Sequence, residues 1–447
     1  MNRRRRRGQA GGRGFSSVWK HFFHCVEKCR NIFPLCGKKS RFFPQCGKSA
    51  LALLLALFAA AGAAGERPDS PAAQGRGGLP IARLAMWCEF MPYAQVAAEL
   101  PVLGKDGCDL IRRVEREGVA DPDFAPLLRA AERAGVGVDA WLLLPYEEHL
   151  YVGQASIAYT RDLARQAADF FEEENLKVRA FVFDCEPSPL LGRELFAAVR
   201  ARSPRQLVQA LRAQLDPEGF QRDTAEINRL VAELRARGYA VDGAANRAFL
   251  DAQARRNVAL EDALNAPVSG VAWDALSFIT YRYRASQLTY VAMLNRYATL
   301  AQRLYGDRAA LDVGLIGDYH DIPANEQRAA LFGGGAAFYG YLRGMRNAFE
   351  LQEAVGVVLG CGVRRINLYA LDGAATSVAG TANWLKAARR ARPLPPVARW
   401  TPVRSLEFGA LGALTEKTFR WCTGGSETSH GNIEFREPAG GAGQRQP

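Results

Sequence analysis

Eight short apolar segments, separated by longer amphipathic ones, restrict the fold of this chain more than any other feature. The apolar segments have the length of buried strands, and alternation of this kind is typical of β/α units with a mostly parallel sheet. The expected strands are residues 81–90, 108–114, 136–145, 178–186, 239–243, 274–283, 311–318 and 364–371.

The segments between these strands have the spacing of surface helices. Apolar residues recur at i, i+3, i+4 and i+7 from Ile227 to Leu234, which is typical of a helix packed on a sheet. We expect helices at residues 124–135, 157–175, 224–238, 288–305 and 338–359.

Eight strands and about as many helices over roughly 310 residues predict the α/β class and a (β/α)8 (TIM) barrel. The largest insertion, residues 187–238, follows the fourth strand and is helical in pattern. An open doubly wound sheet is the alternative. Such a sheet would normally carry a glycine-rich first turn for a dinucleotide, and the turn EFMPYAQ after the first strand has no such pattern. We therefore favour the barrel and expect no cofactor.

The positive charge of the chain is confined to its first 64 residues. This leader contains the run Arg3 to Arg7 and carries the whole net charge of +12, so the remaining residues are balanced. A balanced domain gives no support for nucleic-acid binding. The cysteines of the leader have spacings that fit no paired C-x-x-C zinc site; they are Cys25, Cys29, Cys36 and Cys46.

The leader ends in an apolar run at residues 50–61, followed by small residues. This pattern is typical of an export signal. About a dozen helical residues span less than 20 Å, which is too short for a hydrocarbon core of about 30 Å. We therefore expect an exported protein, periplasmic or extracellular, with no stable membrane anchor.

The rest of the chain divides by composition. Residues 65–79 are rich in Pro, Gly and polar residues and are expected to form a linker. Residues 80–400 are assigned to the barrel, 401–436 to a C-terminal extension and 437–447 to a disordered tail.

The segment FVFDCEPS, residues 181–188, carries the sharpest chemical signal. Side chains alternate along a strand, so Asp184 and Glu186 lie on the same face, about 7 Å apart. They end an apolar strand, which places them at the rim where barrel enzymes act. Two carboxyl groups this close hinder each other's ionisation, so one can hold a proton while the other stays charged. Glycoside hydrolysis needs that division.

This D-x-E resembles the end of the D-x-x-D-x-D-x-E motif of chitinase-like glycoside hydrolases (family 18) and the D-x-E of Chalaropsis-type lysozymes (family 25). The resemblance implies that Glu186 is the general acid/base and that Asp184 orients the substrate. Arg179 and Val182 stand where the chitinase-like pattern has its earlier aspartates. The reaction class therefore transfers better than the substrate.

The sixth expected strand gives a second match. Its SFITYRY resembles the M-x-Y-D of chitinase-like barrels, with Ile279 for Met and Tyr281 for Tyr, whereas Arg282 replaces the Asp. The resemblance implies that Tyr281 donates a hydrogen bond to the reacting sugar. The residues Trp273 and Asp274 precede this strand and are expected at the opposite, structural end of the barrel.

Other residues at predicted strand ends suit a carbohydrate site. Aromatic faces cover the C–H faces of sugar rings, and carboxylates accept hydrogen bonds from hydroxyls. The candidate substrate-binding residues are Trp87, Glu89, Trp141, Tyr146, Tyr369 and Asp372.

Two alternatives stay open. A noncatalytic carbohydrate-binding barrel would keep the cleft without the chemistry. A metal-dependent hydrolase would use Asp318, His320 and Asp321, although zinc and iron sites commonly need more imidazole than this chain supplies. The leading hypothesis is an exported glycoside hydrolase without a metal, acting on an oligosaccharide or a cell-envelope polysaccharide.

Overall fold

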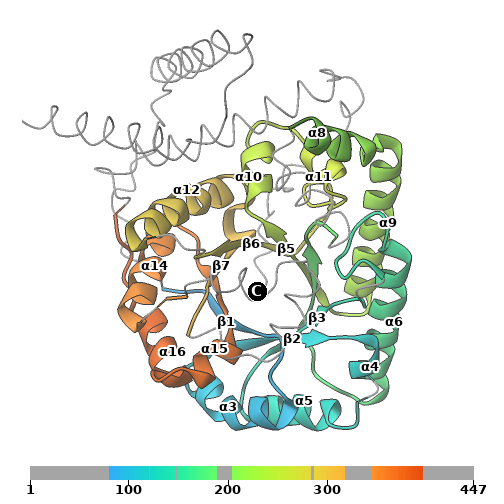
Figure 1. The fold of residues 1–447 in the computed structure, drawn as a ribbon. Helices are drawn as coiled ribbons and strands as arrows, with labels where there is room; N and C mark the ends of the chain where they lie inside the picture. Colours follow the sequence, from blue (N-terminus) through green and yellow to red (C-terminus); the bar gives the residue numbers. More distant parts are fainter. Residues whose placement is uncertain are drawn as a thin grey trace, which may run out of the picture. The chain divides into compact units, whose positions relative to one another are not determined.

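A closed ring of eight parallel strands forms the centre of the structure (Figure 1). The computed structural model describes residues 80–119, 121–145, 148–188, 204–282, 286–317, 344–345 and 347–395. The last strand pairs with the first, with Leu84 in register with Ile366. This pairing confirms the predicted barrel. The open doubly wound sheet is wrong, because it would leave the first strand without that neighbour.

Each expected strand corresponds to one observed strand, with ends that differ by one to three residues in most cases. The seventh begins two residues early, and the chain then leaves the ring: Ile316 forms an isolated bridge with Met345. The strands are β1 (Arg83–Cys88), β2 (Asp109–Val114), β3 (Val138–Leu142), β4 (Ala180–Cys185), β5 (Ala240–Asn246), β6 (Ala275–Tyr281), β7 (Ala309–Gly314) and β8 (Arg365–Tyr369).

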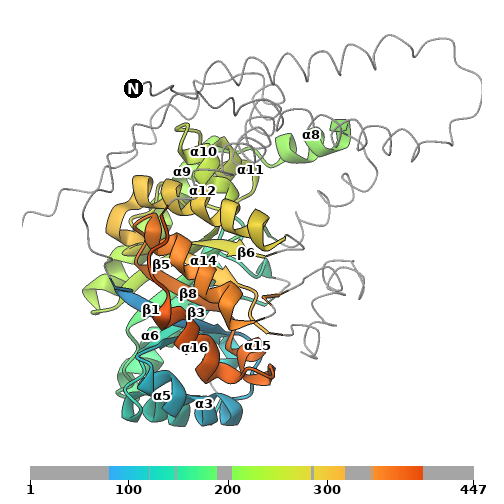
Figure 2. The ribbon, with the colours of Figure 1, turned by 90° about the vertical axis from the view of Figure 1, so that its left-hand side faces the viewer.

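Helices surround the ring. Figures 1 and 2 show α12, α14 and α16 side by side on its outside, and α8 and α9 form the insertion expected after the fourth strand. In the described ranges no helix is long and apolar enough to cross a membrane. The helices are α3 (Tyr93–Lys105), α4 (Arg116–Val119), α5 (Phe124–Arg133), α6 (Ile157–Glu173), α8 (Pro204–Ala213), α9 (Pro217–Ala236), α10 (Ala248–Gln253), α11 (Ala259–Ala263), α12 (Gln287–Tyr305), α14 (Ala348–Gly360), α15 (Leu371–Thr376) and α16 (Gly380–Arg390).

Capping side chains fix where three of the helices begin. The Asp216 carboxylate accepts a hydrogen bond from Gly219 N at 3.0 Å, and Ser286 Oγ accepts one from Thr289 N at 3.2 Å. Asn347 caps α14 in the same way and has an extended backbone. The prediction of one helix over residues 338–359 is therefore wrong at Asn347, and residues 338–343 lie outside the described part.

Side chains of the strands alternate between two cores. On β4, Phe181, Phe183 and Cys185 belong to the core between the ring and its helices. Val182, between them, belongs to a second core inside the ring. Asp184 has the same parity as Val182 and therefore lies on the inner face.

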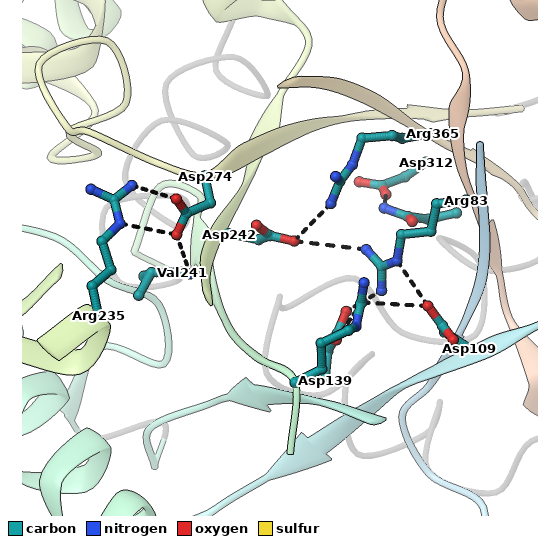
Figure 3. Close-up of polar contacts among 11 residues, drawn as sticks. Arg83, Asp109, Asp139, Arg235, Val241, Asp242, Asp274, Asp312 and Arg365 are labelled. Carbon is teal, nitrogen blue, oxygen red and sulfur yellow. Dashed lines mark hydrogen bonds and ion pairs between the residues drawn. The ribbon is translucent and has the colours of Figure 1, made fainter. Parts of the chain in front are cut away.

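The N-terminal ends of the strands enclose a network of ion pairs inside the ring (Figure 3). Arg83 donates from Nε to Asp109 at 3.1 Å, also contacts Asp139, and lies 3.7 Å from Asp242. Arg365 bonds Asp242 at 3.3 Å. Burial opposes the charge of Arg83, but the three aspartates outweigh it and raise the pKa of this guanidinium. Pairing of this kind is what makes buried charges tolerable.

The residues expected at the structural end of the barrel lie there. Asp274 accepts hydrogen bonds from Val241 N at 2.7 Å and from Arg235 (Figure 3). Trp273 is buried, and its indole donates to Val268 O at 3.1 Å. Gly243 makes room for this ring, because a Cβ at that position would lie 3.0 Å from it.

Replacing Arg83 with Met is expected to destabilise the protein by about 3–5 kcal/mol, because it leaves buried aspartates without their shared cation. The measurement is the free energy of unfolding by denaturant. Arg129→Met is the matched control, since its pair with Glu174 is exposed. Equal stability of the Arg83 and Arg129 variants would contradict a central role for the network.

Candidate active site

The C-terminal ends of the strands form the mouth of the barrel, which is where (β/α)8 enzymes place their chemistry. Asp184 is the fifth residue of β4 and is 5% exposed. Glu186 follows the strand with the same parity and is half-buried. The two acids thus differ in environment: Asp184 is enclosed by protein, whereas solvent reaches Glu186. Their catalytic roles stay a prediction.

The loop after β3 is tied to the end of β4. Val152 N donates to Asp184 O at 3.0 Å, and His149 Nδ1 lies 3.1 Å from Ser188 Oγ. Tyr151 is buried in the inner core. The sequence analysis assigned no role in this site to His149 or Ser188. Their contact depends on the loop conformation, with φ of 74° at His149, which no periodicity reveals.

A connected set of polar and aromatic groups extends around the ring from β6 through β8 and β1 to β2. The Tyr369 hydroxyl donates to Glu89, and Arg113 lies 4.0 Å from the same carboxylate. The ring of Tyr281 packs on that of Tyr369 with centroids 4.6 Å apart. The structure therefore brings together three of the predicted residues, Tyr281, Tyr369 and Glu89. It adds Arg113. The sequence could have marked this residue, because it is charged and lies on the inward-facing side of its strand.

These two groups lie on different strands of the ring. Strands β4 and β8 face each other, because each is four positions from the other in the ring order. Asp184 and Glu186 are thus across the mouth from Tyr369, with β5 between β4 and the strand of Tyr281. Convergence of Asp184, Glu186 and Tyr281 on one substrate atom stays a prediction.

The contacts of Arg282 account for an arginine at the position where the chitinase-like pattern has an aspartate. It follows Tyr281 and has the opposite parity. Its guanidinium is bonded to Glu350 of α14 at 2.7 Å and to Gln287 of α12 at 3.2 Å. The charge at this position therefore joins the ring to its outer helices.

Asp372 holds the loop that follows β1. Its carboxylate accepts hydrogen bonds from the backbone of Glu89 at 2.9 Å and of Phe90 and Met91 at 2.7 Å each. These bonds account for its position at the mouth. The contact of Asp372 with substrate stays a prediction.

Both predicted tryptophans lie inside the barrel. Trp87 and Trp141 are each 2% exposed, and their rings meet edge to face with centroids 4.8 Å apart. Trp87 donates to Asp312 Oδ1 at 3.1 Å. Packing accounts for both indoles, which form a floor of the inner core. Their contact with a sugar stays a prediction.

Asp312 is the acid that the sequence analysis passed over. It is fully buried on β7 and accepts hydrogen bonds from Trp87, from Ser277 at 2.9 Å and from Asn367 at 2.8 Å. Burial raises the pKa of this carboxyl to about 6, although the three donors act in the opposite direction. The sequence could have marked Asp312, because it is an aspartate on the inward-facing side of an apolar strand.

Several predicted residues lie outside the described part of the chain. They are Tyr146 and the candidate metal ligands Asp318, His320 and Asp321. In the described ranges no group of three or more His, Cys, Asp or Glu side chains is arranged to hold a metal ion. The leader and the C-terminal extension are also outside these ranges.

Comparisons with known proteins give structural matches alone. No family model matches the chain, and no curated protein matches its sequence. Similar solved structures include the β-amylase catalytic domain of Paenibacillus polymyxa, at 8% identity and TM-score 0.39, covering 69% of this chain and 97% of that one. A chitinase of Rhizomucor miehei has 13% identity and TM-score 0.39, covering 69% and 100%. A glucosidase of Croceicoccus marinus has 11% identity and TM-score 0.39, covering 70% and 67%. We therefore argue function from the geometry of the site.

Asp312→Asn is expected to change how stability depends on pH. The folded pKa of about 6 lies above the ordinary value of 3.8, so the folded state binds the proton more tightly. This stabilisation is complete below pH 4 and is lost as the pH rises to 6, a change of about 3 kcal/mol. The asparagine variant should lack that loss. Unfolding free energies between pH 4 and 7 measure it.

The exposed Asp307, replaced by Asn, controls for the loss of one carboxylate. A wild-type protein and an Asp312→Asn variant with parallel stability curves over this range would refute the assignment.

Proposed function

We propose that this protein is a glycoside hydrolase-like barrel, with Glu186 as the general acid/base and Asp184 as the carboxylate that assists it. The observation that carries the proposal is the inward parity of Asp184 at the end of β4, with Glu186 continuing on the same face. The pair combines a buried carboxyl group with one that solvent reaches. Environments that differ in this way are what separate the roles of two neighbouring acids.

The opposite wall supports a sugar as substrate. The hydroxyl of Tyr369, the carboxylate of Glu89 and the guanidinium of Arg113 form a polar cluster there, in which Tyr369 and Glu89 are each 4% exposed. Tyr281 is half-exposed and adds an aromatic face beside them. A polyhydroxylated ring needs both kinds of contact.

Glu186 is the residue of the pair that can meet the leaving-group oxygen, since it extends past the strand end. Protonation of that oxygen by a positioned acid typically contributes a factor of about 10² to 10⁴ in rate. Asp184 lies one pleat deeper, next to Val182 in the interior. From there it would orient the substrate group nearest the floor.

The cellular setting belongs to the same proposal. The apolar run at residues 50–61 would export the protein, and an oligosaccharide or a cell-envelope polysaccharide would then be its substrate.

Glu186→Gln is expected to lower hydrolysis by about 10² to 10⁴, with unchanged folding, because the amide cannot donate and recover the proton. A panel of glycans assayed by release of reducing ends provides the measurement, with circular dichroism for folding. Glu173→Gln, on the exposed face of α6, is the matched control.

Full activity of the Glu186→Gln protein would reject the assigned role. Saturable glycan binding without products, in wild type and variant alike, would favour the noncatalytic binding barrel.

A further inference from the structure

A small enclosed cavity lies inside the barrel, apart from the mouth. It has a volume of about 10 Å³. Its wall combines charged and polar side chains of the ion-pair network with the underside of Trp87, and includes Arg83, Asp242, Ser277, Arg365 and Asn367. A cavity of roughly 10–15 Å³ can hold one water molecule if polar groups surround it.

Three atoms of this wall have unused hydrogen-bonding capacity. Within the described residues, Asp242 Oδ1, Asn367 Oδ1 and Arg365 Nε are buried and have no hydrogen-bond partner. Asp242 is 7% exposed and Asn367 is 3% exposed. Leaving such groups without partners costs free energy of folding. A ligand that satisfied all three would remove this cost.

Other polar atoms of the same residues are already engaged. Asp242 Oδ2 accepts from Arg365 Nη2 at 3.3 Å, and Asn367 Nδ2 donates to Asp312 at 2.8 Å. Ser277 also donates to Asp312, at 2.9 Å. The capacity that remains is therefore two acceptors and one donor.

We propose that this cavity is a binding site for one water molecule, which donates to Asp242 Oδ1 and Asn367 Oδ1 and accepts from Arg365 Nε. Water has two donor hydrogens and can accept a further bond, so its capacity matches the three atoms. A cation such as ammonium or potassium would face the Arg365 and Arg83 guanidinium groups. A chloride ion would face the Asp242 carboxylate and could donate nothing to either oxygen.

The water would join two polar groups of the interior into one chain. The ion-pair network reaches Asp242 and Arg365, and the Asp312 cluster reaches Asn367. Bridged by water, a chain of ion pairs and hydrogen bonds would run from Arg83 at the N-terminal end to Trp87. Burial and the neighbouring Asp139 charge raise the pKa of Asp242, and a donated hydrogen bond would stabilise its charged form.

A crystal structure of the full chain at about 1.5 Å resolution tests the site directly. The expected result is a water peak within about 3.2 Å of all three atoms. Crystals soaked in bromide and in rubidium should give no anomalous signal there. A dry cavity, or an anomalous peak in either soak, would overturn the proposal.

A cavity-filling variant gives a second measurement. Ala310 lines the cavity, whereas Ala85 lies in the inner core outside its wall. Ala310→Val should lose one long-lived water in oxygen-17 relaxation dispersion, and Ala85→Val should keep the wild-type count. An unchanged count in a folded Ala310→Val protein would contradict the site, and the wild-type crystal structure decides it if that variant does not fold.

Discussion

Every second side chain of eight strands must fit inside the closed ring, and this constraint determines most of the interior. The interior of an eight-stranded barrel is only just wide enough for side chains to fill it. Charged residues of inward parity can therefore remain only where they pair. At the N-terminal end they form the network around Arg83, and halfway along Asp312 is surrounded by three donors. Towards the mouth the enclosure ends, and Glu186 meets solvent.

The same constraint divides the interior into levels along the barrel axis. The ionic groups farthest from the mouth pair with one another, so they support the fold. At the mouth, Tyr369, Glu89 and Arg113 are linked on one wall, and Asp184 with Glu186 lies on the other. Between these levels, the buried rings of Trp87 and Trp141 pack against each other.

The sequence was sufficient to predict the eight strands and the face of β4 that carries the acids, because both follow from local apolar patterns. It could not show that Trp87 and Trp141 are buried. The alternation of side chains along a strand assigns each residue to a face of the sheet, but it does not give the depth of that residue along the barrel axis. The His149–Ser188 contact joins two loops, and a local pattern carries no information about it. The network around Arg83 brings together residues from several strands, and its pairing depends on ring closure. The start of α14 at Ala348 was missed because apolar residues continue on both sides of Asn347.

The seam between β1 and β8 has a consequence for synthesis of the chain. Asp372, which fastens the loop after β1, lies 283 residues beyond Glu89. At about 5–20 residues per second, a ribosome needs about 15–60 s to make that interval. Throughout it, the newly made first strand has an open edge that can pair with a neighbouring polypeptide. Until its final strand emerges, a nascent chain of this topology therefore exposes one strand edge that the finished ring pairs.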